Sequence, residues 1–343
     1  MDVRFFQDTP GDAGTWDQYV ARQDGATVDH LWGWRRVLSE SFGFTPHYLG
    51  AVEDGQLVGI LPMFRMPRGF GRAALSSIPF GNYGGICADT EEVAAALLEE
   101  ARELMRRTRA AYVELRHRTA MRGETLQQRS VYSRFWIPLT GDAHEHLRHL
   151  GQHNRAKVRK AEKSGLQIKV CRDLAPVYPI HLHTTHRLGT PCFPRRYFEL
   201  LLETFASQAE IHLACLDSQP VAYTLSLIFK ETFVCQFNGS LEPFFKYYPN
   251  HLLIWHGIER ACTLQLREFD YCRSRSTSGS ADFKRKMHLI EEPLAYQYEL
   301  VNGKSLPQRN PSNPKYQWMI RTWQRLPLSL TQWLGPTVVR YFA

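Results

Sequence analysis

The stretch Leu266–Leu300 reads LREFDYCRSRSTSGSADFKRKMHLIEEPLAYQYEL and is the most informative part of the chain. Its opening alternates and ends at Phe269-Asp270-Tyr271, a pattern that predicts a strand. A loop rich in Ser, Thr and Gly follows, and a short basic helix then holds Phe283-Lys284. Loop amides and a helix start both direct N–H groups outward, where they can hold an anion. The segment therefore predicts a strand–loop–helix anion site.

The charged side chains of this segment suggest group-transfer chemistry. Asp270 closes the strand, where α/β proteins commonly place their sites, so it could orient or deprotonate an amine. Lys284 and Arg273 could neutralise a phosphate or a developing oxyanion. Ser274 and Gly279 belong to the same loop and are candidates for phosphate binding. The alternative is structural: Asp270 caps the loop, and Lys284 buries its stem while its ammonium reaches water.

Length and composition describe a folded protein of two domains. The chain has 343 residues, of which 43% are hydrophobic and 22% charged. It begins without a secretory signal pattern, and its strongest apolar stretch, around 221–229, is too short to cross a bilayer. Seven cysteines stand singly, which argues against a disulfide framework and against a thiolate zinc site. We therefore expect a cytoplasmic protein.

The charge balance favours an anionic partner. The net charge is +8, which suits phosphate, a nucleotide, RNA or an anionic membrane surface, although such a field can also be merely solvating. In the basic run 154–163, Arg155, Arg159 and Lys163 recur every four residues on one helix face. That face is either solvated or in contact with a phosphorylated or RNA-like ligand. Stable binding to DNA is not expected.

Several common site motifs are absent. His149 and His153 have helical spacing, but the residues between them do not form H-E-x-x-H, so no metal is expected. The chain contains no G-x-S-x-G, no G-x-x-x-x-G-K-[ST] and no G-x-G-x-x-G. A hydrolase serine of the elbow type and the two common nucleotide fingerprints are therefore unsupported.

Both halves of the chain follow one order of elements: helix, hairpin, helix, strand. This order predicts an α/β fold with mixed sheets flanked by helices. We divide the chain into a first domain at 1–141, a second at 142–305 and a tail at 306–343. The principal helices are expected at 90–109, 143–164, 177–188, 195–206 and 251–263, and the principal strands at 47–53, 56–66, 112–116, 211–216, 220–229 and 232–237.

The tail begins with a proline-rich linker, Leu306–Pro314, and continues into a segment that contains Trp318, Trp323 and Trp333. Two interpretations stay open. The segment is either a helix that docks back on the body or a basic amphipathic segment that lies on a membrane surface.

A series of short motifs runs through nearly the whole chain. They are HLWGW (30–34) with FG (42–43), GILP (59–62), PFGNYGG (79–85), ELRH (114–117), NRAKVRKA (154–161), LGTP (188–191), FD (269–270), RS (273–274), FK (283–284) and the Asn-Pro pairs at 310 and 313. In these motifs the chain resembles the FemAB-related proteins of exosortase/PEP-CTERM exopolysaccharide systems, within the FemAB and GNAT-like acyltransferase group.

The resemblance implies two tandem GNAT-like domains and transfer of an acyl or aminoacyl group to an amine. The donor is aminoacyl-tRNA in FemAB proteins, whose acceptor is a peptidoglycan precursor, and acyl-CoA in other GNAT-like relatives. It implies no permanently bound cofactor, a small-molecule, glycan or peptide amine as acceptor, and a role in the cell envelope or in exopolysaccharide synthesis. Glu114 and Arg116, on the matching strand of the first half, become secondary site candidates.

The chain departs from the family pattern in the opening segment, where the family reads approximately F-D-F-G-R-S-K-x-G-T-G-x-Y-x-F-K-x-x-W-G. Cys272 and Thr277 replace glycines, Ala281 replaces the tyrosine, and Met287 and His288 replace the Trp-Gly pair. Loss of glycine restricts positive φ, and loss of the tyrosine removes a hydrogen-bonding group. These departures motivate an alternative: a non-catalytic protein that binds an anionic glycan precursor, a lipid head group or a protein partner.

Overall fold

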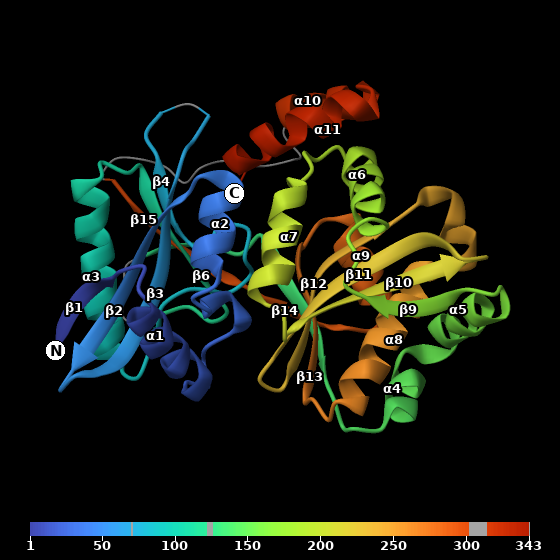
Figure 1. Cartoon of the computed structure of the whole chain (residues 1–343), viewed down its shortest axis with the longest axis horizontal. Coiled ribbons are helices and arrows are strands. Elements are labelled where there is room, and N and C mark those ends of the chain that lie inside the picture. The colour runs from blue at the N-terminus through green and yellow to red at the C-terminus, as the bar shows by residue number, and fades with distance from the viewer. Residues whose placement is uncertain (70, 122–125, 302–313, 343) are drawn as a thin grey trace. The chain divides into compact units, whose positions relative to one another are not determined.

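The computed structural model describes residues 1–69, 71–121, 126–301 and 314–342. The chain forms two compact units, which are described separately (Figure 1). The first unit contains Met1–Val131, the segment that begins at Pro293 and the last residues from Arg340. The second contains Tyr132–Glu292 and the C-terminal helices up to Val339.

The first unit is built on an eight-stranded mixed sheet in the order β1-β2-β3-β4-β6-β15-β7, with β5 beside β3. The strands are β1 (Asp2–Phe6), β2 (Thr45–Glu53), β3 (Gln56–Met66), β4 (Ala74–Ser77), β5 (Cys87–Ala88), β6 (Tyr112–His117), β7 (Gln127–Arg129) and β15 (Ala295–Leu300). The helices are α1 (Pro10–Arg22), α2 (Trp34–Phe42) and α3 (Glu91–Arg107). Only β4 and β6 run parallel in this sheet, among the described residues.

Helix α3 supplies the main core of the first unit. Thr90 caps it by accepting a hydrogen bond from the Val93 N–H, and Glu91 and Glu92 stand at its positive end. Its apolar residues recur at helical spacing and lie buried against Leu49, Leu61 and Val113 of the sheet. Each fully buried side chain of this size contributes about 1.5–3 kcal/mol.

The second unit contains a seven-stranded mixed sheet in the order β14-β8-β13-β12-β11-β10-β9. The strands are β8 (Tyr132–Pro138), β9 (Gln167–Cys171), β10 (Ala209–Leu216), β11 (Gln219–Phe229), β12 (Thr232–Ser240), β13 (Glu268–Arg275) and β14 (Ile290–Pro293). The helices are α4 (Ala143–His149), α5 (Gly151–Lys163), α6 (Val177–Leu188), α7 (Arg195–Thr204), α8 (Pro249–Thr263), α9 (Gly279–Lys286), α10 (Pro314–Arg325) and α11 (Leu328–Val339).

Helices cover both faces of the second sheet. In Figure 1, α6 and α7 lie on one side, and α8 lies on the other with α4 and α5 outside it. The core between α8 and the sheet includes Ile254 and Ile258 from α8 and Phe233 and Phe269 from the strands. Two mixed α/β sheets confirm the predicted fold class.

The structure differs from the sequence-based elements in several places. The single helix expected at 143–164 is two helices, because Gly151, at the junction between them, has a φ of 77°, outside the α-helical region. Strands β1, β8 and β15 were not among the predicted elements. The proline-rich linker and its Asn-Pro motifs at 306–313 lie outside the described residues.

The compact units also differ from the division at residues 141 and 142. Strand β8 pairs with β13, so the second unit already begins at Tyr132. Strand β15 pairs with both β6 and β7, so a segment expected in the second domain belongs to the first unit. Among the described helices, none is long and apolar enough to cross a membrane.

Candidate functional site

The second sheet opens between β12 and β13. These two strands run parallel, but their ladder has only three pairs, from Thr232 opposite Glu268 to Val234 opposite Asp270. Strand β12 then continues to Ser240 and β13 to Arg275. The strands therefore part at their carboxyl ends, which is where α/β sheets commonly bind ligands.

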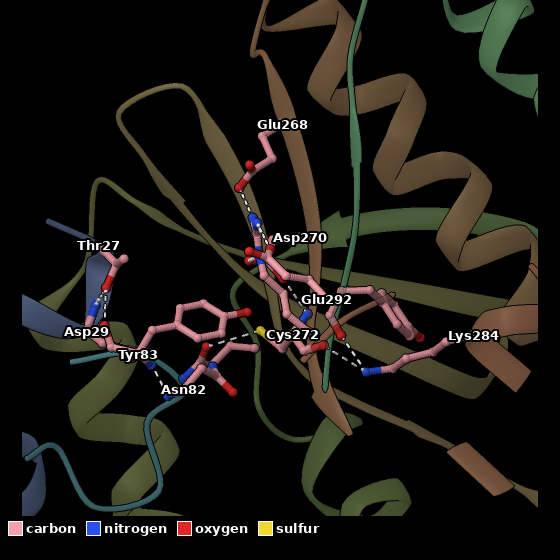
Figure 2. A network of polar contacts seen from close by, with 12 residues as sticks. Thr27, Asp29, Asn82, Tyr83, Glu268, Asp270, Cys272, Lys284 and Glu292 are labelled. Carbon is pink, nitrogen blue, oxygen red and sulfur yellow. Dashed lines mark hydrogen bonds and ion pairs between the residues drawn. The ribbon is translucent and has the colours of Figure 1, made fainter. Parts of the chain in front are cut away.

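A bulge in β13 lies directly at this opening. The register with β8 shifts between Asp270 and Arg273, and Cys272 adopts a φ of 56°. The Cys272 N–H donates to Asp270 Oδ1 over 2.7 Å. Lys284 Nζ, from α9, donates to the carbonyl oxygens of Tyr271 and Cys272 over 2.6 and 3.2 Å, and lies 3.3 Å from that of Arg273 (Figure 2). Asp270 and Lys284 thus hold the bulge from its two sides.

Asp270 is also the partner of a buried arginine. Its Oδ2 accepts a hydrogen bond from Arg134 Nε over 2.7 Å, and the guanidinium also contacts Glu268 and, over 3.4 Å, Glu292 (Figure 2). Arg134 is 0% exposed and Asp270 is 1% exposed. Arg134 lies on β8, the strand that the sequence did not indicate, where it and Ser133 interrupt the aromatic and apolar residues.

The environment of Lys284 changes its acid–base behaviour. Burial lowers the pKa of Lys284 to about 8, against the opposing influence of Cys272, Cys235 and Asp270. The side chain is only 3% exposed, so the interpretation with its ammonium in water is wrong. In this structure Lys284 and Asp270 shape the backbone at the opening. Their direct action on a substrate stays a prediction.

The remaining residues of the segment have defined places. The Arg273 guanidinium lies 4.6 Å from the centre of the Tyr132 ring, and the Ser274 hydroxyl bonds to that of Ser280 over 3.0 Å. Gly279 begins α9, where Ser278 Oγ accepts the Ala281 N–H. The start of α9, which the sequence offered to an anion, is therefore already capped by the chain.

A second positive feature lies at the start of α8, the helix that follows β12. Tyr248, the residue before Pro249, has a φ of 59° and gives the helix no side-chain cap. Lys157 Nζ and Lys160 Nζ, both on α5, lie 5.9 and 5.3 Å from the centre of the Tyr248 ring. The positive end of a 15-residue helix and two ammonium groups together favour a phosphate.

The sequence predicted the helix itself but did not identify its start as a candidate phosphate site. It selected the other basic face of 154–163, although the Tyr-Pro-Asn run at 248–250, with proline at the first helical position, is a helix-start signal. Arg155 and Arg159 instead line an open groove of about 540 Å³ on α4 and α5, together with Arg148 and His144. None of the residues that line this groove belongs to β13 or α9. The predicted residues of the second unit therefore fall into two groups, one on β13 and α9 and the other in the groove on α4 and α5.

Glu114 and Arg116 lie at the corresponding place in the first unit, where β4 and β6 run parallel. They form a buried ion pair with 2.8 Å between Arg116 Nε and Glu114 Oε1. Arg116 also contacts the carbonyl oxygens of Ile78 and Gly81 over 3.3 and 3.1 Å. These contacts hold the loop 78–86, so both residues stabilise backbone in this structure.

Another buried carboxylate holds the same loop. Asp29 Oδ2 accepts the N–H groups of Asn82 and Tyr83 over 2.7 and 2.9 Å (Figure 2). The Tyr296 hydroxyl donates to the Asn82 carbonyl over 2.7 Å. The glycine-rich segment 80–85 contains no helix or strand, and these anchors fix the course of its backbone.

The departures from the family pattern have a structural outcome. Cys272 and His288, which replace glycines, have φ values of 56° and 60°. The chain thus keeps the left-handed backbone that glycine favours, in spite of the added side chains. Ala281 and Met287 replace aromatic residues and are 0% exposed in the core of the second unit. Cys272 and His288 therefore occupy left-handed backbone positions, and Ala281 and Met287 fill the core with non-aromatic side chains.

Comparison with known proteins places much of this segment within a recognised domain. Residues 148–285, which include β12, β13, α8 and all of α9 except its last residue, match the family model of the acetyltransferase (GNAT) domain. No curated protein matches the chain.

Solved structures match over most of the chain. FemX superposes with a TM-score of 0.68 at 14% identity, over 93% of this chain and 100% of FemX. The C-terminal domain of a putative lysylphosphatidylglycerol synthetase from Agrobacterium fabrum superposes with a TM-score of 0.57 at 14% identity, over 84% of this chain and 91% of that domain. A tandem GNAT protein from the clavulanic acid biosynthesis pathway superposes with a TM-score of 0.55 at 12% identity, over 89% of this chain and 100% of that protein. These similarities confirm the predicted fold of two GNAT-like domains.

Proposed function

We propose that the chain is an N-acyltransferase that moves an acyl or aminoacyl group from a phosphate-bearing donor to an amine. The observation that carries this proposal is the opening between β12 and β13, together with the start of α8 and the nearby Lys157 and Lys160; α8 follows β12 after a short 3-10 helix at Glu242–Tyr247. An extended donor arm in the opening would bond to the strand edges, as an added strand does. Its phosphates would lie at the helix start.

The reaction needs no covalent enzyme intermediate. The acceptor nitrogen forms a bond to the donor carbonyl carbon, and the C–S bond of a thioester or the C–O bond of an ester breaks. The amine loses a proton, and the departing thiolate or alkoxide gains one. The protein's contribution is to position both substrates and to place N–H donors at the developing oxyanion.

In this proposal Asp270 and Lys284 act as positioning residues. By binding the Cys272 N–H and the carbonyl oxygens of residues 271 and 272, they fix the direction of the β13 backbone at the opening. Asp270 is 1% exposed, and each of its carboxylate oxygens already accepts a hydrogen bond within the chain, from Arg134 or Cys272. Arg273, Ser274 and Gly279 remain proposed contacts for the donor.

The donor has two chemical sources, acyl-CoA and aminoacyl-tRNA. The names of similar proteins support both: one is a tandem GNAT protein described without acetyl-CoA, and another is a putative lysylphosphatidylglycerol synthetase. The groove with Arg148, Arg155 and Arg159 would extend the basic track for the longer donor, tRNA. As acceptor we propose an amine on a small molecule, glycan or peptide precursor in the cytoplasm, for envelope or exopolysaccharide synthesis.

The test measures donor binding and product formation with the full chain. We expect the Lys157→Ala/Lys160→Ala variant to raise the Kd for the true donor about tenfold, because each surface ammonium–phosphate ion pair contributes about 0.7 kcal/mol. Lys163→Ala, an exposed lysine on the same helix, is the matched control. Arg155→Ala/Arg159→Ala should weaken the binding of charged tRNA and leave the affinity for acetyl-CoA unchanged. Unchanged affinity for both donors in the Lys157/Lys160 variant would overturn the site.

One observation favours the alternative of a non-catalytic binding protein. Asp270 and Lys284 are both buried and bonded within the chain, and Ala281 stands where the family has a tyrosine. In that case mass spectrometry would find donor binding without any amide product across a panel of amines. A product that disappears in Asp270→Asn and Lys284→Ala would exclude it.

A further inference from the structure

The C-terminal helices of the second unit expose two tryptophans. The chain has eight tryptophans, and six of them are buried or half-buried. Trp318 on α10 and Trp333 on α11 are instead 67% and 75% exposed. Exposed aromatic residues of this size on one pair of helices indicate a surface that contacts something else.

Defined contacts hold these helices on α6, so the exposed face is presented by a fixed structure. Gln324 Nε2 donates to the Arg187 carbonyl over 2.7 Å, and His186 Nε2 lies 2.9 Å from the Leu326 carbonyl oxygen. Gly335 packs so closely on Cys192 that a Cβ atom there would lie 2.4 Å from the thiol sulfur. Figure 1 shows both helices in red beside α6.

The exposed side chains follow the helical period. On α10, Trp318, Arg321 and Arg325 are spaced by three and four residues and are all exposed. On α11, Leu330 and Trp333 are one turn apart, and Leu330 is 37% exposed. Each helix therefore presents one face that combines tryptophan with basic or apolar side chains.

The charge of this region has a single sign. From residue 301 to residue 343 the sequence contains six lysines and arginines and neither aspartate nor glutamate. A segment with exposed arginines and no acidic residue of its own is complementary to a negatively charged partner. Tryptophan, for its part, favours the boundary between water and lipid, where its ring is apolar and its N–H remains hydrated.

We propose that α10 and α11 dock on the surface of an anionic lipid bilayer. Trp318, Trp333 and Leu330 enter the head-group boundary, and Arg321 and Arg325 bind the lipid phosphates. Each helix has 12 residues and is about 18 Å long, so it lies on the membrane and does not span it. This docking is independent of the proposed transfer reaction.

The test measures partition of the full chain into vesicles of phosphatidylcholine alone and of an equal mixture with phosphatidylglycerol. We expect binding to the mixed vesicles that weakens with salt, and a blue shift of tryptophan emission. Arg321→Glu/Arg325→Glu should lower the partition coefficient by more than about thirtyfold, because loss of each basic residue alone removes about 1 kcal/mol at such a surface and each new carboxylate is repelled by the anionic lipid. Trp318→Ser/Trp333→Ser should lower it about tenfold and remove the blue shift.

Two controls separate docking from general charge and from folding. Lys169→Glu/Arg267→Glu makes the same charge change at exposed positions elsewhere in the second unit, and Val170→Ser removes a 53% exposed apolar side chain. Both controls should bind within twofold of the parent, and all variants should unfold at the parent temperature. Equal losses in the controls, or no vesicle binding by the parent, would overturn the proposal. The proposal would also be overturned if the parent were a dimer that the tryptophan substitutions convert to a monomer, and if lipid had no effect on either protein.

Discussion

At the scale of single residues, backbone strain marks the segment around the candidate site. His288 follows α9, is exposed and has a φ of 60°. A side chain in the left-handed region costs about 1–2 kcal/mol, and helices commonly end with glycine there. We expect His288→Gly to raise the free energy of unfolding by about 1 kcal/mol, measured by urea denaturation. His288→Ala keeps the Cβ atom and is the control; equal stability of the two variants would contradict this account.

His117 in the first unit couples stability to pH. Its Nδ1 lies 3.0 Å from Gln297 Oε1, and its Nε2 accepts the Ile86 N–H over 2.9 Å. Because Oε1 also accepts the Met121 N–H, the network assigns the proton of a neutral ring to Nδ1. Burial lowers the pKa of His117 to about 4. Protonation would place a second proton at Nε2, against the Ile86 N–H.

The sign of the resulting pH effect is fixed. The unfolded chain takes up this proton near pH 6.5 and the folded chain only near pH 4, so stability from His117 is complete above 6.5 and declines as the pH falls to about 4. The loss is about 3 kcal/mol. His117→Gln should be less stable at pH 7 and should lose correspondingly less on acidification. Parallel pH profiles of parent and variant would contradict the assignment.

At the scale of elements, Lys284 joins α9 to the bulge of β13. Replacing it by methionine keeps the apolar stem and leaves the Tyr271 carbonyl without its ammonium donor. A hydrogen bond to a charged group contributes about 1.5–3 kcal/mol, so we expect Lys284→Met to lower the free energy of unfolding by about 2 kcal/mol. Lys286→Met, at an exposed position of the same helix, is the control. Equal stability of Lys284→Met and the parent would show that the bulge does not depend on this contact.

The sequence indicated the elements whose pattern is local. Strand β13, the loop after it and α9 were predicted, because an alternating run, small residues and a basic helix follow one another. Strand β8 was missed because Arg134 is buried by partners more than 130 residues away, and no local period reveals such a pairing. Lys284 was predicted at the site from its own segment. Its hydrogen bonds to the carbonyl groups of the bulge were not predicted, because a local pattern does not reveal tertiary contacts.

At the scale of the whole molecule, each unit is completed by a strand from beyond the sequence-based boundary. Strand β8 lies between β14 and β13 of the second sheet, and β15 lies between β6 and β7 of the first. Their removal would expose the edges of neighbouring strands and leave backbone groups without partners. The chain therefore crosses between the units at residues 131 to 132 and 292 to 293, and again before and after the C-terminal helices α10 and α11.

This topology makes a sharp prediction for fragments. A fragment of residues 142–343 lacks Arg134, so the buried Asp270 loses its opposite charge, which costs about 3–5 kcal/mol. A fragment of residues 132–343 restores that strand with only ten more residues. We expect the longer fragment to show a cooperative thermal transition by near-ultraviolet circular dichroism, and the shorter one to show none. Restoring Tyr132–Pro138 with Arg134→Leu separates strand pairing from charge: a transition at an intermediate temperature means that both contribute. A cooperative transition in the 142–343 fragment would show instead that the second core folds without β8, and the buried ion pair would then be dispensable for the fold.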